Sequence, residues 1–358
     1  MNFELKPTRN PEDAAAGVGD PGYNGASRRR GFSLGWRAAV GAAILVGLLA
    51  VQRVDGGALW GTLRRVDGPL LVAACASFLL LMAVKSWRWN FLVDCAGLRY
   101  GFWPSFRSYL GAFVLGIVTP GRLGELARAA QLRSETGAEW EPCLRTVVAD
   151  RLFDLVFLAS FGPFALCAVW VDGVGDGILL TGFISLYVAV ALTLGMSGKL
   201  LSRWRPKWRP LQFVLGCLES ASRDLTGRTG LIGSAITFLS YAVYFGGSLV
   251  LLRALGMGLS FRDVACVTGC LSLILLLPIS IAGVGTREAT LLVLLGRYGV
   301  AREEALAYSI LQFAVFTLFG GIVGAIALAA SPRAERPANL AAGFAATSPH
   351  TEFKPRSR

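Results

Sequence analysis

The stretch TPGRLGE, residues 119–125, decides how this chain folds, and the stretch PISIAGVGTRE, residues 278–288, is a second version of it. Each contains a proline, glycines, one arginine and one glutamate, and each follows an apolar segment. Inside a membrane, such a sequence ends a helix before the bilayer has been crossed. Charges placed there are costly, so they are usually functional or tightly paired. The two motifs therefore predict two broken or re-entrant helical segments.

The composition around these motifs requires a membrane. The chain is 54% hydrophobic and only 16% charged over 358 residues, with a mean hydropathy of +0.55, and its apolar residues come in long blocks. Ordinary soluble domains carry far less apolar surface. The net charge of +12 does not indicate nucleic acid, because the basic residues cluster between apolar blocks as positive-inside loops do. We expect the lipid bilayer and anionic lipid head groups as partners.

Cysteine and histidine usage excludes several kinds of site. None of the seven cysteines forms a CxxC pair, and most lie within or beside apolar blocks, where cysteine behaves as a small hydrophobic residue. The single histidine, His350, is in a polar tail. We therefore expect no disulfide framework, no metal site, no cofactor and no histidine-based acid–base chemistry in the core.

The apolar blocks predict an all-α, polytopic helical membrane protein with about seven to eight transmembrane helices. A span needs about 20 apolar residues to cross a core of ~30 Å. Such blocks occupy residues 68–87, 147–171, 177–196, 230–252, 264–282 and 304–330, and we read the shorter apolar run at residues 38–51 as part of a first helix. We read residues 1–34 as a disordered cytoplasmic tail, 35–330 as the transmembrane domain and 331–358 as a second disordered tail. Arginines at 28–30 before an uncleaved first helix place the N-terminus in the cytoplasm.

Two further apolar pieces are too short to span. Residues 106–118 would make a helix of about 20 Å, and residues 289–298 are shorter still. Broken helices are tolerated where protein or a water-filled cavity surrounds the freed backbone, so these pieces favour a cavity. Residues 264–282 and 289–298 together favour a re-entrant hairpin. The predicted backbone hinges are Pro120, Gly121, Gly124, Pro278, Gly283 and Gly285.

Charged residues in and near the first motif predict an anion site. Arg122, Glu125 and Arg128 share one face if a helix begins after Pro120-Gly121, and a helix N-terminus next to an arginine binds anions such as phosphate. The third span carries three more charges, Asp150, Arg151 and Asp154. We expect its carboxylates to pair with Arg122 or Arg128, because unpaired charges at this depth are unfavourable. A purely structural ion-pair network is the alternative reading.

The second motif carries Arg287 and Glu288. Arg287 would hold a phosphate while Glu288 orients it, and an Arg–Glu pair with only a structural role is the alternative. Since Glu288 is its only counter-charge, we expect Arg287 to be the unpaired, ligand-holding arginine. Arg88 lies between two tryptophans in KSWRW, residues 85–89, which is typical of an interfacial aromatic belt with cations reaching toward water.

Residues 120–125, 150–154 and 278–288, in this order and spacing, resemble the lysylphosphatidylglycerol synthase transmembrane-region family, also described as flippase-like integral membrane proteins. The resemblance covers roughly residues 35–330. It implies a polytopic helical domain that moves or accommodates lipids across the bilayer. In the two-part synthases this domain passes aminoacylated lipid to the outer leaflet. Because the large soluble catalytic domain of those synthases has no counterpart here, we expect no aminoacyl transfer by this chain.

These observations predict a flippase-like transporter in the cytoplasmic membrane that moves or accommodates a phosphate-bearing lipid, either phospholipid or polyprenyl-linked. Arg122, Arg287, Arg151 and Arg128 would bind the head group, and Glu125, Asp150, Asp154 and Glu288 would orient the arginines or carry protons. Two alternatives remain. One is a membrane enzyme that modifies or glycosylates a lipid phosphate. The other is a non-catalytic partner of a separate lipid synthase.

Overall fold

Every regular element that the structure describes is a helix, so the all-α prediction is confirmed. The computed structural model describes residues 55–119, 124–171, 173, 175–201, 209–277 and 283–330. The predicted tails and the predicted first span, residues 38–51, lie outside them. The helices in chain order are α2 (Gly56–Arg64), α3 (Gly68–Cys95), α4 (Phe102–Val118), α5 (Ala127–Thr136), α6 (Trp140–Trp170), α7 (Asp176–Leu201), α8 (Arg209–Arg223), α9 (Gly227–Ala254), α10 (Phe261–Leu276), α11 (Thr286–Gly296), α12 (Arg302–Phe313), the π-helix η3 (Ala314–Phe319) and α13 (Gly320–Ala329).

Five helical segments in the described part of the chain are long and apolar enough to cross a membrane, which confirms a multi-pass protein. They are Gly68–Cys95, Trp140–Trp170, Asp176–Met196, Gly227–Ala254 and Arg302–Ala329. Five of the predicted spans correspond to them. The predicted sixth span, residues 264–282, is helical only as far as Leu276. At 16 residues, α10 is about 24 Å long, which is shorter than the bilayer core.

α3 extends well beyond its predicted end at residue 87. The side chain of Asp67 accepts a hydrogen bond from the Leu70 N–H at 3.0 Å, and a proline follows in the first turn, both favourable at a helix start. The helix then continues without a break to Cys95, and Gly97 turns the chain with a φ of +77°. Lys85 and Arg88, which the sequence analysis assigned to an interfacial belt, therefore lie inside a 28-residue helix.

Both proline–glycine motifs lie between two short helices. The first separates α4 from α5, and the second separates α10 from α11. The two helices on either side of each motif pack against one another. Gly283 and Gly285, two of the predicted hinge residues, have φ of +78° and +82°, a conformation that favours glycine. A side chain on Gly124 would overlap the Leu115 carbonyl. Pro120, Gly121 and Pro278 lie outside the described residues.

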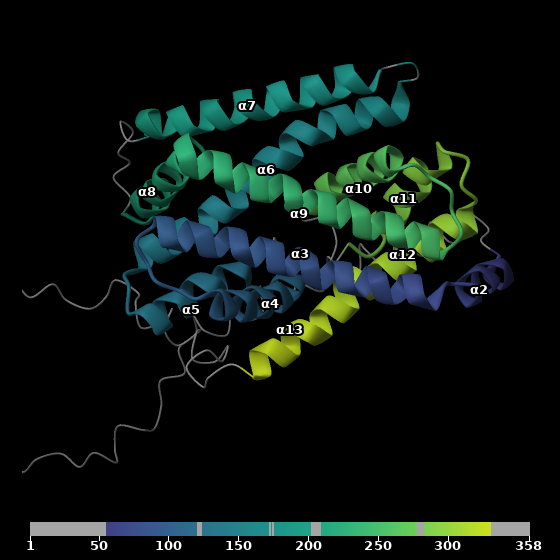
Figure 1. Ribbon diagram of the computed structural model, residues 1–358, viewed down its shortest axis with the longest axis horizontal. Helices are drawn as coiled ribbons and strands as arrows, with labels where there is room; N and C mark the ends of the chain where they lie inside the picture. The colour runs from purple at the N-terminus through teal and green to yellow at the C-terminus, as the bar shows by residue number, and fades with distance from the viewer. Residues whose placement is uncertain are drawn as a thin grey trace, which may run out of the picture.

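The order long–short–short–long occurs twice. The first half, α3 to α6, has helices of 28, 17, 10 and 31 residues. The second half has 28, 16 and 11 residues in α9 to α11, followed by the 28-residue run from α12 to α13. The first short helix of each half packs against the last long helix of the other half: α4 contacts α13, and α10 contacts α6. α7 and α8 connect the two halves (Figure 1).

The two halves run in opposite directions. α3 and α9 pack along each other through the middle of the molecule (Figure 1). The N–H of Asp67, at the start of α3, donates to the carbonyl of Ala254 at the end of α9, at 2.9 Å. The Thr229 hydroxyl, near the start of α9, lies 3.8 Å from Sγ of Cys95 at the end of α3. The helices are therefore antiparallel, so the two halves of the repeat have inverted topology relative to each other.

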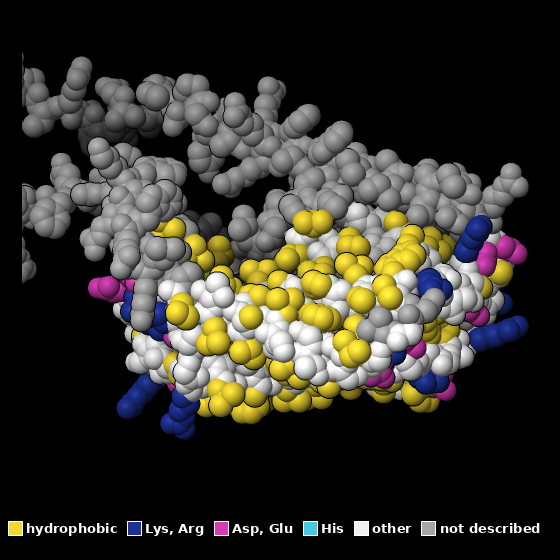
Figure 2. Space-filling model, turned by 90° about the horizontal axis from the view of Figure 1, so that it is seen from above, with side chains coloured by type: hydrophobic (Ala, Val, Ile, Leu, Met, Phe, Trp, Pro, Cys, Tyr) yellow, Lys and Arg dark blue, Asp and Glu magenta, His cyan; other side chains and the backbone are white. Residues whose placement is uncertain are grey.

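The surface has the distribution of a membrane-embedded protein. Figure 2 shows apolar side chains along the middle of one face, with most of the Lys, Arg, Asp and Glu side chains toward its two ends. α7 illustrates the lipid-facing character: Ile184, Val188 and Leu192, spaced one turn apart, are all about half exposed. Such a contiguous apolar surface is stable only in contact with lipid or another apolar surface.

Close contact between α4 and α13 requires glycine at one position in α13. A Cβ at Gly324 would overlap the Leu110 carbonyl of α4, whereas a Cβ at Gly321 meets only Ile117 at 3.9 Å. We expect Gly324→Ala to lower the free energy of unfolding in detergent by about 1–3 kcal/mol, because overpacking forces the helices apart. Gly321→Ala, the matched control on the same helix, should leave the thermal midpoint unchanged. Equal midpoints for the two variants would contradict the helix contact.

Candidate functional site

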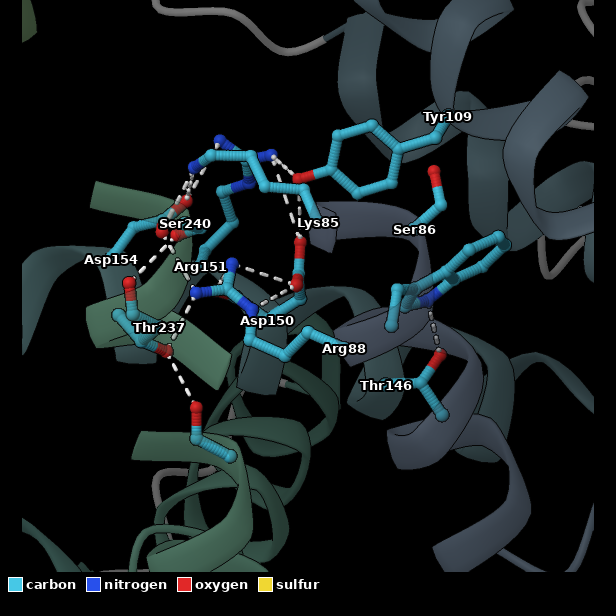
Figure 3. A network of polar contacts seen from close by, with 12 residues as sticks. Lys85, Ser86, Arg88, Tyr109, Thr146, Asp150, Arg151, Asp154, Thr237 and Ser240 are labelled. Carbon is cyan, nitrogen blue, oxygen red and sulfur yellow. Dashed lines mark hydrogen bonds and ion pairs between the residues drawn. The ribbon is translucent and has the colours of Figure 1, made fainter. Parts of the chain in front are cut away.

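One buried network of polar side chains joins α3, α4, α5, α6 and α9, and Figure 3 shows its members on α3, α4, α6 and α9. We call it the charge cluster. Its members are Lys85, Arg88, Tyr109, Glu125, Arg128, Asp150, Arg151, Asp154 and Thr237. The cluster unites the predicted charges of the first motif and of the third span that the structure describes. Arg122 lies outside the described residues.

Arg88 is fully buried and connects three helices. Its Nε donates to Oδ1 of Asp150 at 2.8 Å, and its Nη2 donates to the Asp150 carbonyl at 3.0 Å. Its Nη1 donates to Asp154 Oδ1 and to Thr237 Oγ1, each at 2.9 Å. Arg88 on α3 is thereby fixed to α6 and α9, and the interpretation of Arg88 as an interfacial belt residue is wrong.

Asp150 is the common acceptor of the charge cluster. While Oδ1 faces Arg88, Oδ2 accepts hydrogen bonds from both Nη atoms of Arg128 at 3.0 Å and from the Tyr109 hydroxyl at 3.1 Å. The Arg128 guanidinium also stacks 4.1 Å from the ring centroid of Tyr109. Asp150 and Arg128 are both fully buried. The prediction that an aspartate of the third span pairs with Arg128 is confirmed.

The cluster reaches the molecular surface through its cations. Asp154 accepts a hydrogen bond from Lys85 Nζ at 2.9 Å, and Arg151 forms an ion pair with Glu125. The Arg151 side chain is 30% exposed and that of Lys85 is 16% exposed, compared with 10% for Asp154 and 9% for Glu125. The accessible edge is therefore mainly cationic, while the carboxylates lie deeper.

The described part of the cluster carries an excess positive charge. Lys85, Arg88, Arg128 and Arg151 contribute four cations, and Glu125, Asp150 and Asp154 contribute three carboxylates, so 4 − 3 leaves one positive charge. Nε of Arg151 is buried and has no hydrogen-bond partner among the described residues. A buried charge is stable when it is paired, so the arrangement is suited to an anion at the Arg151 edge.

The second motif forms a separate and internally neutral pair. Arg287 donates to Glu288 Oε1 at 2.8 Å and to the Ser309 hydroxyl at 3.0 Å, and its guanidinium lies 4.6 Å from the Phe313 ring centroid. Oε2 of Glu288 accepts the Gly285 N–H at 2.6 Å and so caps α11. The expectation that Arg287 is unpaired is wrong, because Glu288 and Ser309 both satisfy it.

Sequence reasoning missed Lys85 and Arg88 as site residues because it read residues 85–89, at the end of the predicted second span, as an interfacial belt. A signal was present in the run that follows, residues 89–95, which contains Trp89, Phe91, Leu92 and Val93 and continues the apolar pattern past the arginine. Trp89 is fully buried, although the neighbouring Trp87 is half exposed. Arg88 therefore sits on a buried face and not at a helix end.

Removing the carboxylate of Asp150 should destabilise the protein severely. Asp150→Asn leaves Arg88 and Arg128 buried without their shared counter-charge, and breaking a buried pair costs roughly 3–5 kcal/mol. We expect a large loss of folded protein in fluorescence-detected size-exclusion chromatography. Glu219→Gln, which breaks the surface pair with Arg223, is the control and should cost less than about 1 kcal/mol. A normal elution profile for Asp150→Asn would show that the cluster does not hold the helices together.

Comparison with known proteins agrees with this architecture. A search of curated proteins found no match to the chain. A family model matches residues 36–324, which is most of the chain and includes both proline–glycine motifs and the whole charge cluster. The chain thus belongs to the family described as the lysylphosphatidylglycerol synthase TM region.

Proposed function

We propose that this chain is a lipid transporter of the cytoplasmic membrane that binds a phosphate-bearing lipid by its head group at the charge cluster and moves it across the bilayer. Family membership supports a lipid-related membrane role. The observation that carries the proposal is the excess of four cations over three carboxylates, with Arg151 and Lys85 at the accessible edge. Ionisable groups at this depth ordinarily mark substrate pathways.

In this proposal the residues of the cluster divide by exposure. Arg88, Arg128 and Asp150 are fully buried and form the frame. Arg151 and Lys85 are the phosphate ligands, and they exchange part of their contact with Glu125 and Asp154 for phosphate oxygens. A guanidinium binds phosphate with two parallel hydrogen bonds, and a lysine ammonium adds a point charge.

The remaining proposed ligands hold different positions. Arg122 adjoins the cluster in sequence, three residues before Glu125, and stays a proposed head-group ligand. Arg287 would have to leave Glu288 and Ser309 before it could bind a phosphate, so we assign it to a later stage of transport. Glu125, Asp150, Asp154 and Glu288 remain the proposed orienting or proton-carrying carboxylates.

The inverted repeat suggests how the head group could be exposed to both sides. Transporters with inverted repeats place substrate at broken helices near the bilayer midplane and expose it alternately as one half moves against the other. Here the charge cluster lies largely in the first half, and Thr237 is its contact from α9. We propose that movement of α9 along α3 opens the cluster to one leaflet and then to the other.

A second candidate function is that of a non-catalytic partner of a separate lipid synthase. The observation that favours it is the mutual pairing of every charged member of the charge cluster. Such pairing would suit a rigid membrane scaffold. A scaffold would hold its partner without moving lipid, so the two functions differ in a measurable rate.

Reconstitution into liposomes tests the transport proposal. We expect the protein to move fluorescent anionic phospholipid or polyprenyl phosphate between leaflets, and Arg151→Gln and Lys85→Gln to lower the initial rate at least about tenfold, the equivalent of ~1.4 kcal/mol. Arg145→Gln is the matched control, because Arg145 also lies on α6, is 31% exposed and pairs with Asp224 outside the cluster. It should transport at the wild-type rate.

Two outcomes would contradict transport. In the first, the wild-type protein moves neither the anionic phospholipid nor the polyprenyl phosphate. In the second, Arg151→Gln and Lys85→Gln both transport as fast as Arg145→Gln. Either result, with folded protein in the vesicles, would favour the synthase-partner function. A reporter fused to the N-terminus separately tests the proposed cytoplasmic location of that end.

A further inference from the structure

The second half contains a buried polar site that has no ionised side chain. Four side chains from three helices form it, and we call it the neutral site. They are Ser248 on α9, Thr268 on α10, and Tyr308 and Gln312 on α12. The first three are fully buried and Gln312 is 4% exposed.

The hydrogen-bonding groups of the neutral site do not fully satisfy one another. The Ser248 and Thr268 hydroxyls and the Gln312 carbonyl oxygen are buried and make no hydrogen bond of good geometry with the described residues. The Tyr308 hydroxyl interacts with both hydroxyls but can donate to only one of them, and its contact with the Gln312 amide nitrogen is a long 3.5 Å. Buried polar groups in native proteins almost always have a partner, so three together at one place point to a bound molecule.

The neutral site corresponds to the charge cluster by its place in the repeat. Thr268 lies seven residues after the start of α10, as Tyr109 does in α4 (268 − 261 and 109 − 102). Gln312 lies ten residues after the start of α12, as Asp150 does in α6 (312 − 302 and 150 − 140). Arg88 of the charge cluster has no counterpart in the second half. Arg88 lies 20 residues after the start of α3, and the residues 20 and 21 positions after the start of α9 are Gly247 and Ser248.

Size and charge limit what the neutral site can hold. Its unpaired atoms are enclosed by protein, so a lipid head group does not fit. The ion pair of the second motif, Arg287 and Glu288, is already neutral and bridges to α12 through Ser309, one turn before Gln312. A cation would therefore bring an uncompensated charge, whereas a water molecule requires only two to four polar partners.

We propose that the neutral site binds ordered water, which bridges α9, α10 and α12 where the first half uses ion pairs. The water accepts from the Ser248 and Thr268 hydroxyls and donates to Gln312 Oε1 and to Tyr308. The π-helix η3 begins two residues after Gln312, and such segments are frequent at functional sites. The inference is independent of the proposed transport activity, because it concerns only the second half.

The sign of a stability change tests this proposal. Thr268→Val removes the hydroxyl without changing the shape of the side chain. If the hydroxyl binds water, the variant and Ser248→Ala should each lower the thermal midpoint of the purified full-length protein by about 2–4 °C, and the double variant should lose less than the sum because both lose one bridge. Thr290→Val is the control, because the Thr290 hydroxyl bonds only within its own helix, to the Thr286 carbonyl at 2.7 Å.

A dry site gives the opposite sign, because removing an unsatisfied buried hydroxyl stabilises a protein. A raised midpoint in both single variants would overturn the proposal. So would a wild-type midpoint that rises when sodium or potassium chloride replaces choline chloride, since that would identify a cation. Hydroxyl-radical footprinting gives a direct readout: we expect Tyr308 to be modified although it is fully buried, and at least about threefold less in Thr268→Val. An unmodified wild-type Tyr308 would also overturn it.

Discussion

The carboxylate of Asp150 connects most of the first half of this protein. It accepts hydrogen bonds from Arg88 on α3, Tyr109 on α4 and Arg128 on α5, while it is itself part of α6. In lipid there is little hydrophobic driving force between helices, so hydrogen bonds between helices add to van der Waals packing in placing the short helices. The two carboxylate oxygens of Asp150 make directional hydrogen bonds that fix the positions of α4 and α5. Arg88 and Arg128 in turn fix the orientation of the carboxylate. The broken helix therefore depends on this buried pairing.

Much of the architecture can be predicted from the sequence, because membrane spans depend on local composition. Both short segments follow from a proline, glycines and charges that interrupt an apolar run. The ends of helices are less accessible to such reasoning, and Arg88 shows why. An arginine beside two tryptophans has the same local pattern at an interface and in a helix core. The partner that decides between them, Asp150, lies 62 residues away, and that pairing exists only in three dimensions.

The two halves share a backbone plan and differ in chemistry. Asp150 and Gln312 hold equivalent places on their long helices, and so do Tyr109 and Thr268. The residue types differ enough that no sequence periodicity relates them, which is why the repeat was visible only as two motifs. The first half carries the ion pairs and the excess charge. The second half keeps one closed pair, Arg287 with Glu288, and a set of neutral polar groups.

The separation of Arg88 from its carboxylate also has a consequence for how the chain is made. α3 leaves the ribosome with Lys85 and Arg88 unpaired, and each charge costs up to roughly 2.5–3.5 kcal/mol on insertion, which is the value for the centre of a membrane helix. At about 5–20 residues per second, the 62 residues that separate Arg88 from Asp150 take about 3–12 s to synthesise. During that interval α3 is poorly suited to release into lipid. The charged helix of the first half thus makes membrane insertion dependent on the timing of translation.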